Sequence, residues 1–182
     1  MKILKWLLII VVALAIIIIA FLYYLGLFSQ PKTYETVMGP YTIAYESFTG
    51  PYAQTGPIFD KIYKAVKAAG INTTRGLGIY YDNPSQVPAE KLRSDCGVII
   101  EKKDLIRFAK VRNRFSTKVL PKKACIVTEF PLRNILSYMI GPIKGYPALM
   151  KFAGKKNYKT VMTYELYDEA QGKIFFVMVI IK

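Results

Sequence analysis

The hydrophobic pattern divides the chain into one long apolar segment and a region of short runs. From Trp6 to Phe28 no residue is charged, and as a helix this segment would span roughly 35 Å, enough for the core of a bilayer. A cleaved signal peptide is the alternative. However, the run is longer than the apolar part of such peptides, and no small-residue cleavage site precedes Gln30-Pro31. We predict a single-pass membrane anchor over residues 1–28, contacting lipid through residues 6–28, and a linker over 29–32.

The first part of the remaining chain alternates between strand-like and helix-like patterns. Apolar positions from Gly56 onward recur at helical spacing and stop at Gly70, which predicts a helix with proline at its first turn and glycine at its end. Runs of β-branched and aromatic residues flank it and predict strands. These strands cover Thr33–Met38, Tyr41–Phe48, Ile79–Tyr81 and Cys96–Ile100.

The second part repeats this order of patterns. Strands are predicted over Ala124–Phe130, Thr160–Tyr167 and Ile174–Ile181. Between the first two we expect a short helix over Asn134–Ile140 and a second over Ala148–Ala153. Pro147 separates the two, because a proline inside a helix removes a backbone donor and clashes with the preceding turn.

Matching sequence marks indicate that the chain is duplicated. Gly141-Pro142-Ile143 repeats Gly56-Pro57-Ile58, and Tyr-Asp ends a strand at both Tyr81-Asp82 and Tyr167-Asp168. A unit of this size cannot bury its helix alone. We predict an α+β domain over 33–182 in which two pseudo-symmetric β-α-β-β units form an antiparallel sheet with helices on one face. The copies would cover 33–100 and 116–182, joined by a basic connection over 101–115.

The charge of the chain is strongly positive, at +14, and much of it lies between the two copies. This basic stretch indicates either contact with anionic lipid headgroups or a solvated face that keeps the domain soluble. No nucleic-acid-binding module is recognisable, so no nucleic-acid partner is expected. The stretch contains Lys102, Lys103, Arg107, Lys110, Arg112, Arg114, Lys118, Lys122 and Lys123.

The charges beside the anchor give a small preference for its orientation. Lys2, Lys5 and the amino terminus precede the span, whereas Lys32 is offset by Glu35 after it. By the positive-inside rule, the N-terminus is predicted in the cytosol and the domain on the extracytoplasmic side.

The chain contains two cysteines and no histidine, which excludes several kinds of site. A Ser/His or Cys/His nucleophile and a Cys/His zinc site both need histidine, which is absent. We expect neither a metal nor a cofactor. Cys96 and Cys125 lie in apolar strands, so they are either small core residues or, outside the cytosol, a disulfide pair.

Several motifs resemble the GyrI-like small-molecule-binding domain, also found as the effector-binding module of bacterial multidrug-responsive regulators. They are TGPY at Thr49–Tyr52, IYYDNP at Ile79–Pro84, VPAEKLRSD at Val87–Asp95 and YELYD at Tyr164–Asp168. The resemblance covers about residues 33–181. It implies a small-molecule ligand bound in a groove between the two copies.

Two further motifs are similar to those of a membrane-anchored branch of this family, the testis-expressed ER-phagy receptors. They are EFPLRNILS at Glu129–Ser137 and YPALMKF at Tyr146–Phe152. Such receptors recruit autophagy proteins through a long C-terminal tail, and this sequence ends at Lys182, so we do not expect that role here. Their domain faces the cytosol, the reverse of the orientation that the flanking charges favour.

The resemblance also implies an acidic residue in the groove, which falls on Glu165. By the two-residue period of a strand, Glu165 and Tyr167 share one face, while Tyr164 and Leu166 share the other with Met162. The second face is more apolar, and we expect it to pack under the helices. Tyr81 aligns with Tyr167, so the two are predicted to form paired walls of the groove. Tyr45 and Tyr52 are weaker candidates, and Tyr80 should point away from Tyr81.

Three functions remain open from the sequence. The first is binding of small, cationic or amphipathic molecules, since a carboxylate among aromatic rings attracts a cation. The second is hydrolysis of reactive small molecules with Glu165 as base, if burial raises its pKa. The third is a membrane-tethered adaptor that docks a protein partner and has a vestigial groove.

Overall fold

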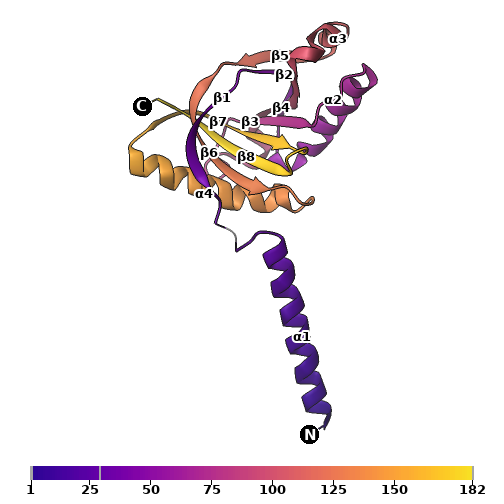
Figure 1. Cartoon of the computed structure of the whole chain (residues 1–182), viewed down its shortest axis with the longest axis vertical. Coiled ribbons are helices and arrows are strands. Elements are labelled where there is room, and N and C mark those ends of the chain that lie inside the picture. Colours follow the sequence, from indigo (N-terminus) through magenta and orange to yellow (C-terminus); the bar gives the residue numbers. More distant parts are fainter. Residues whose placement is uncertain (1, 29, 182) are drawn as a thin grey trace.

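The computed structural model describes residues 2–28 and 30–181, and it begins with one long helix. Helix α1 (Lys2–Tyr24) extends away from the rest of the molecule (Figure 1). Its segment Ile3–Tyr24 is long and apolar enough to cross a membrane. An N-terminal helix of this kind serves either as a membrane anchor or as a signal sequence.

The rest of the chain forms an eight-stranded antiparallel sheet with the order β1-β6-β8-β7-β3-β4-β2-β5. The predicted α+β class is therefore confirmed. The strands are β1 (Thr33–Met38), β2 (Tyr41–Thr49), β3 (Arg75–Tyr80), β4 (Arg93–Ile100), β5 (Ser116–Leu120), β6 (Lys123–Pro131), β7 (Lys159–Asp168) and β8 (Lys173–Ile181). The helices after α1 are α2 (Gly56–Ala68), α3 (Leu105–Ala109) and α4 (Ser137–Lys156), with short 3-10 turns at Tyr52–Gln54, Ala89–Lys91, Lys102–Asp104 and Arg112–Arg114.

The sheet order shows the internal duplication directly. One half contains β2, α2, β3 and β4, the other contains β6, α4, β7 and β8, and the halves meet where β3 pairs with β7. The strand that precedes each half has crossed over, because β1 pairs with β6 and β5 pairs with β2. The sequence did not predict β5, whose short run contains both Ser116 and Lys118 among its five residues.

The sheet is curled, and its helix-free face closes on itself. Tyr41 of β2 and Tyr164 of β7 are separated by two strands, which in a flat sheet would put them at least roughly 14 Å apart. Their ring centroids lie only 6.5 Å from each other. The cluster enclosed by this curl draws on both halves and includes Ile43, Leu77, Ile99, Val127, Phe175 and Val177.

Helices α2 and α4 cover the opposite face of the sheet. Ile62 and Val66 of α2 pack over the first half, and Leu149 and Ala153 of α4 pack over the second. This arrangement corrects the expected faces of β7. Tyr164 and Leu166 point into the helix-free cluster, whereas Tyr167 lies on the helix side. Both faces are buried because the sheet curls, so the more apolar face is not the one that carries the helices.

Helix α4 also differs from the prediction, since it runs unbroken through Pro142 and Pro147. Each proline leaves the carbonyl four residues earlier without its helical donor. Those carbonyls belong to Tyr138 and Ile143, both at exposed positions where water can satisfy them. Gly141, Gly145, Leu149 and Ala153 form a buried stripe at four-residue spacing. Packing of this stripe on β6 and β8 thus outweighs the local preference to break.

The two cysteines are buried and unpaired. Cys96 lies in β4 of the first half and Cys125 in β6 of the second. Burial raises the pKa of the Cys96 thiol to about 11 and also raises that of Cys125. In this structure both are therefore small, unreactive core residues.

Candidate functional site

Glu165 lies in the middle of β7, on the face covered by the helices, and only 5% of it is exposed. Both carboxylate oxygens accept hydrogen bonds from tyrosines. The Tyr146 hydroxyl of α4 donates to Oε1 at 2.8 Å, and the Tyr167 hydroxyl donates to Oε2 at 2.7 Å. Among the described residues no lysine or arginine forms an ion pair with Glu165. It is a buried carboxylate held by neutral groups alone.

This environment shifts the acid–base behaviour of Glu165. Burial disfavours the charged form and raises its pKa from 4.5 to about 7, although the two tyrosine hydrogen bonds act in the opposite direction. The same carboxylate, together with burial, raises the pKa values of Tyr146 and Tyr167, so both remain protonated donors. Near neutral pH, Glu165 therefore exchanges between its acid and its carboxylate.

Aromatic rings from both halves enclose the carboxylate. The hydroxyls of Tyr80 and Tyr167 are hydrogen-bonded at 2.8 Å, which extends the polar chain from β7 to β3. The Tyr167 ring lies between Phe59 of α2 and Tyr138 of α4, with ring centroids 5.5 and 5.3 Å away. The site is thus an aromatic cluster that bridges the two helices over a single acid.

Two glycines of β3 make room for these rings. Gly76 is paired with Tyr167 and Gly78 with Glu165 across the β3–β7 ladder. A Cβ atom added to Gly76 would meet the Tyr167 ring at 3.3 Å, and one added to Gly78 would meet the Tyr80 hydroxyl at 2.8 Å. The alternating glycines of Arg75–Tyr80 therefore leave a recess on the helix side of the sheet.

The structure separates the predicted site residues into two groups. Glu165 and Tyr167 are adjacent, and Tyr52 reaches the same cluster through Tyr80, with ring centroids 4.8 Å apart. Tyr81 and Tyr45 lie elsewhere, beside the ion pair of Lys118 and Asp95.

The predicted pairing of Tyr81 with Tyr167 is not found. Tyr81 follows the last residue of β3, and its hydroxyl donates to Asp95 Oδ2 at 2.6 Å. The ammonium group of Lys118 lies 4.2 Å from the Tyr45 ring centroid. Tyr80 instead makes the contact with Tyr167 that we expected of Tyr81.

Tyr80, Tyr146, Phe59 and Tyr138 are members of the site that the sequence prediction missed. The sequence did indicate that Tyr80 points opposite to Tyr81, and the glycines at every second position of β3 were a signal that this side must accept large rings. No comparable signal marks Tyr146, because it precedes Pro147, where the helix was expected to be interrupted.

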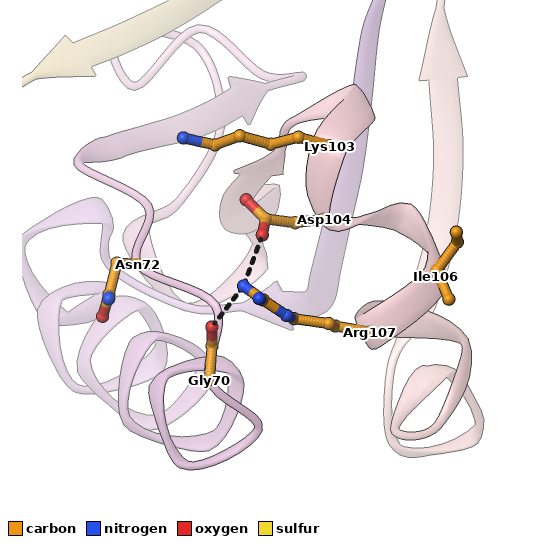
Figure 2. A pocket seen from close by; sticks show the side chains of 6 residues that line it. All are labelled: Gly70, Asn72, Lys103, Asp104, Ile106 and Arg107. Carbon is orange, nitrogen blue, oxygen red and sulfur yellow. Dashed lines mark hydrogen bonds and ion pairs between the residues drawn. The ribbon is translucent and has the colours of Figure 1, made fainter.

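A hollow in the described part of the chain lies away from this cluster. It has a volume of about 430 Å³ and is lined by residues of the connection after α2 and of the segment around α3. Figure 2 shows Arg107 bridging the carbonyl of Gly70 and the carboxylate of Asp104, at 3.3 and 3.5 Å. Arg107 and Asp104 thus serve to attach α3 to the end of α2.

The family of the chain follows from a sequence comparison. The family model described as the GyrI-like small molecule binding domain matches residues 34–168. The chain belongs to this family. The match contains every residue of the Glu165 cluster, from Tyr52 to Tyr167.

A curated relative of this GyrI-like chain is human testis-expressed protein 264. The two are 29% identical over 137 residues, which is 71% of this chain and 42% of the human protein. This chain therefore spans less than half the length of that relative.

Solved structures share the GyrI-like fold at low sequence identity. The C-terminal domain of EcmrR has a TM-score of 0.61 at 12% identity, and the alignment covers 84% of this chain and 98% of that domain. SAV2435 bound to tetraphenylphosphonium has a TM-score of 0.50 at 12% identity, with coverage of 82% and 94%. These likenesses describe the fold.

Proposed function

We propose that this GyrI-like chain is a membrane-anchored domain that binds small amphipathic cations at Glu165. The ligand would lie between α2 and α4, against the rings of Tyr167 and its neighbours. Helix α1 would be the anchor. The charges that flank it favour an extracytoplasmic domain, which stays a prediction.

The observation that carries this proposal is a buried carboxylate that has no lysine or arginine of residues 2–28 or 30–181 paired with it. An ionised carboxylate away from water is costly unless it is paired. Tyr146 and Tyr167 offset part of this cost, yet the pKa of Glu165 still rises to about 7. A bound organic cation would supply the missing charge, and the aromatic faces around it would add cation–π attraction.

The arrangement of the rings indicates how a ligand would enter. Tyr138, on the first turn of α4, is 37% exposed and lies against the buried Tyr167 ring. Rotation of the Tyr138 side chain would open the cluster from the solvent side. The rings pack closely, as they also would in an adaptor with a vestigial groove, and a binding measurement decides between the two functions.

Tetraphenylphosphonium is a suitable probe, because it is the cation bound to the structural neighbour SAV2435. We expect the full chain in detergent to bind it at pH 8 and Glu165→Gln to bind it at least about tenfold more weakly, since a buried charge pair is worth more than 1.4 kcal/mol. Because the cation favours ionised Glu165, affinity should rise as the pH increases through about 7. Isothermal titration calorimetry measures both effects.

The control is Glu90→Gln, which removes an exposed carboxylate and changes the net charge equally. An affinity that is the same in the Glu165 and Glu90 variants would contradict the assignment of the site. If the natural chain bound neither this probe nor other monovalent organic cations, the adaptor function would be favoured.

A second candidate is a Glu165-dependent hydrolase. The observation that favours it is the pKa of about 7, which suits a general base at neutral pH. Turnover of reactive esters or epoxides that is lost in Glu165→Gln would support this function. Binding without turnover across such a panel would argue against it.

A further inference from the structure

The outer face of α4 is apolar although it faces away from the sheet. Met139, Ile143, Pro147 and Met150 are all exposed, and Ile143 is 67% accessible. Their spacing of three to four residues places them on one side of the helix, opposite the buried stripe that begins at Gly141. Single exposed apolar residues are ordinary, but four along one helix face form a continuous patch.

Helix α4 lies on the side of the domain from which α1 extends (Figure 1). Two contacts link the end of α1 to the segment just before α4. Arg133 donates a hydrogen bond from Nη1 to the Tyr24 carbonyl, and its Cζ lies 5.3 Å from the centroid of the Tyr24 ring. Leu25 is buried at the same junction. If α1 crosses a bilayer, these contacts place α4 next to the bilayer surface.

The charge on α4 fits a lipid surface. Lys144 and Lys151 lie beside the apolar patch on the helix, and Lys155 and Lys156 follow in its last turn. No acidic residue occurs anywhere in α4. Lysines beside an apolar helix face are typical of helices that lie in the membrane interface and bind anionic headgroups.

We propose that α4 is an interfacial helix that seats the domain on the bilayer that α1 spans. Met139, Ile143 and Met150 would enter the headgroup region, and the lysines would contact anionic lipid. This inference rests on the anchor in the proposed function and is independent of ligand binding at Glu165. It also differs from the lipid contact that the sequence suggested, which was at the basic connection over 101–115.

An environment-sensitive fluorophore on single introduced cysteines tests the seating. The full chain is reconstituted into phosphatidylcholine–phosphatidylserine vesicles, with the label at Ile143→Cys or Met150→Cys. Ile106→Cys is the matched control, because Ile106 is an apolar residue that is 84% exposed. It belongs to α3, which lies far from α1 in Figure 1. Leu14→Cys reports whether α1 is inserted. The natural cysteines are buried and do not compete for the label.

We expect emission at positions 143 and 150 to shift to the blue and to fall about twofold when quencher-labelled lipid is included. The label at 106 should respond to neither. An inserted α1 with a label at 143 that behaves like 106 would overturn the seating and leave the anchor intact. Shielding at 143 without quenching by lipid would indicate a protein or a second copy on this face and also overturn it. A label at 14 outside the bilayer would overturn the anchor and the seating together.

Discussion

Two carboxylates with the same low solvent exposure have pKa values that are shifted in opposite directions. Glu165 and Asp95 are each 5% exposed, and they lie on strands of different halves of the sheet. Burial raises the pKa of Glu165 to about 7. Burial acts on Asp95 as well, but the Lys118 ammonium and the hydroxyls of Ser47 and Tyr81 outweigh it, so the pKa of Asp95 is lowered.

Glu165 lies deeper in the protein than Asp95, and the two carboxylates also differ in the charge of their partners. Each carboxylate accepts hydrogen bonds from hydroxyl groups, yet only Asp95 has a cation beside it. The ion pair between Lys118 and Asp95 has a structural role, because it links β5 to β4. Glu165, with the same kind of hydroxyl partners and no cation, is left able to accept one. We infer that an incomplete charge pair distinguishes a binding group from a structural one here.

The largest effect should come from the pH dependence of stability. Between pH 4.5 and about 7 the unfolded chain has released the Glu165 proton while the folded chain retains it, so the free energy of unfolding falls as the pH rises through this window. The shift corresponds to on the order of 3 kcal/mol. In Glu165→Gln this fall should be absent, as measured by urea unfolding in detergent at pH 5 and pH 8. If the free energy of unfolding changed with pH in the same way in the natural chain and in Glu165→Gln, the pKa of Glu165 would not be raised in the folded chain.

Removing the cation beside Asp95 should have a somewhat smaller effect. Lys118→Met leaves the buried carboxylate unpaired, and because the Lys118 side chain is 29% exposed we expect a loss of about 2 kcal/mol, less than for a fully buried pair. Urea unfolding measures the loss, with Lys122→Met as the control for an exposed lysine. Adding Asp95→Asn to Lys118→Met should restore part of the stability. An equal loss in the Lys122 variant would contradict the role of the pair.

The smallest effects should distinguish the two adjacent tyrosines. Tyr80→Phe removes the hydrogen bond to Tyr167, and Tyr81→Phe removes the one to Asp95. Each should cost about 1 kcal/mol of stability. Only Tyr80→Phe should weaken tetraphenylphosphonium binding, by roughly threefold, because only Tyr80 belongs to the Glu165 cluster. A larger loss of affinity in Tyr81→Phe would favour the pairing of Tyr81 with Tyr167 that the sequence suggested.

Local patterns were sufficient to predict most elements of this fold. The strand over Thr33–Met38 was predicted with its exact ends, and the helix closed by Gly70 was right to within one residue. The repeated Gly-Pro-Ile and Tyr-Asp marks indicated the duplication. These features depend on nearby residues, and so a single sequence contains them.

The features that depend on long-range packing could not be predicted. The prolines of α4 favour a break locally, and only the stripe beginning at Gly141, packed on β8, explains why the helix continues. The period of β7 put Glu165 and Tyr167 on one face but could not say which face carries helices, since the curl buries both. Because the wrong face was expected to carry the helices, Tyr81 was predicted in the site in place of Tyr80.

The exchange of β1 and β5 has a mechanical consequence for the whole domain. Strand β1 precedes the first half in the chain but pairs with β6 of the second half. Strand β5 precedes the second half but pairs with β2 of the first, so each half contributes a strand to the other. A cut in the connection around Arg112 would divide the backbone into two pieces and still leave β1 paired with β6 and β5 paired with β2. We therefore expect ligand entry between α2 and α4 to involve side chains and helices and to leave the strand order of the sheet unchanged.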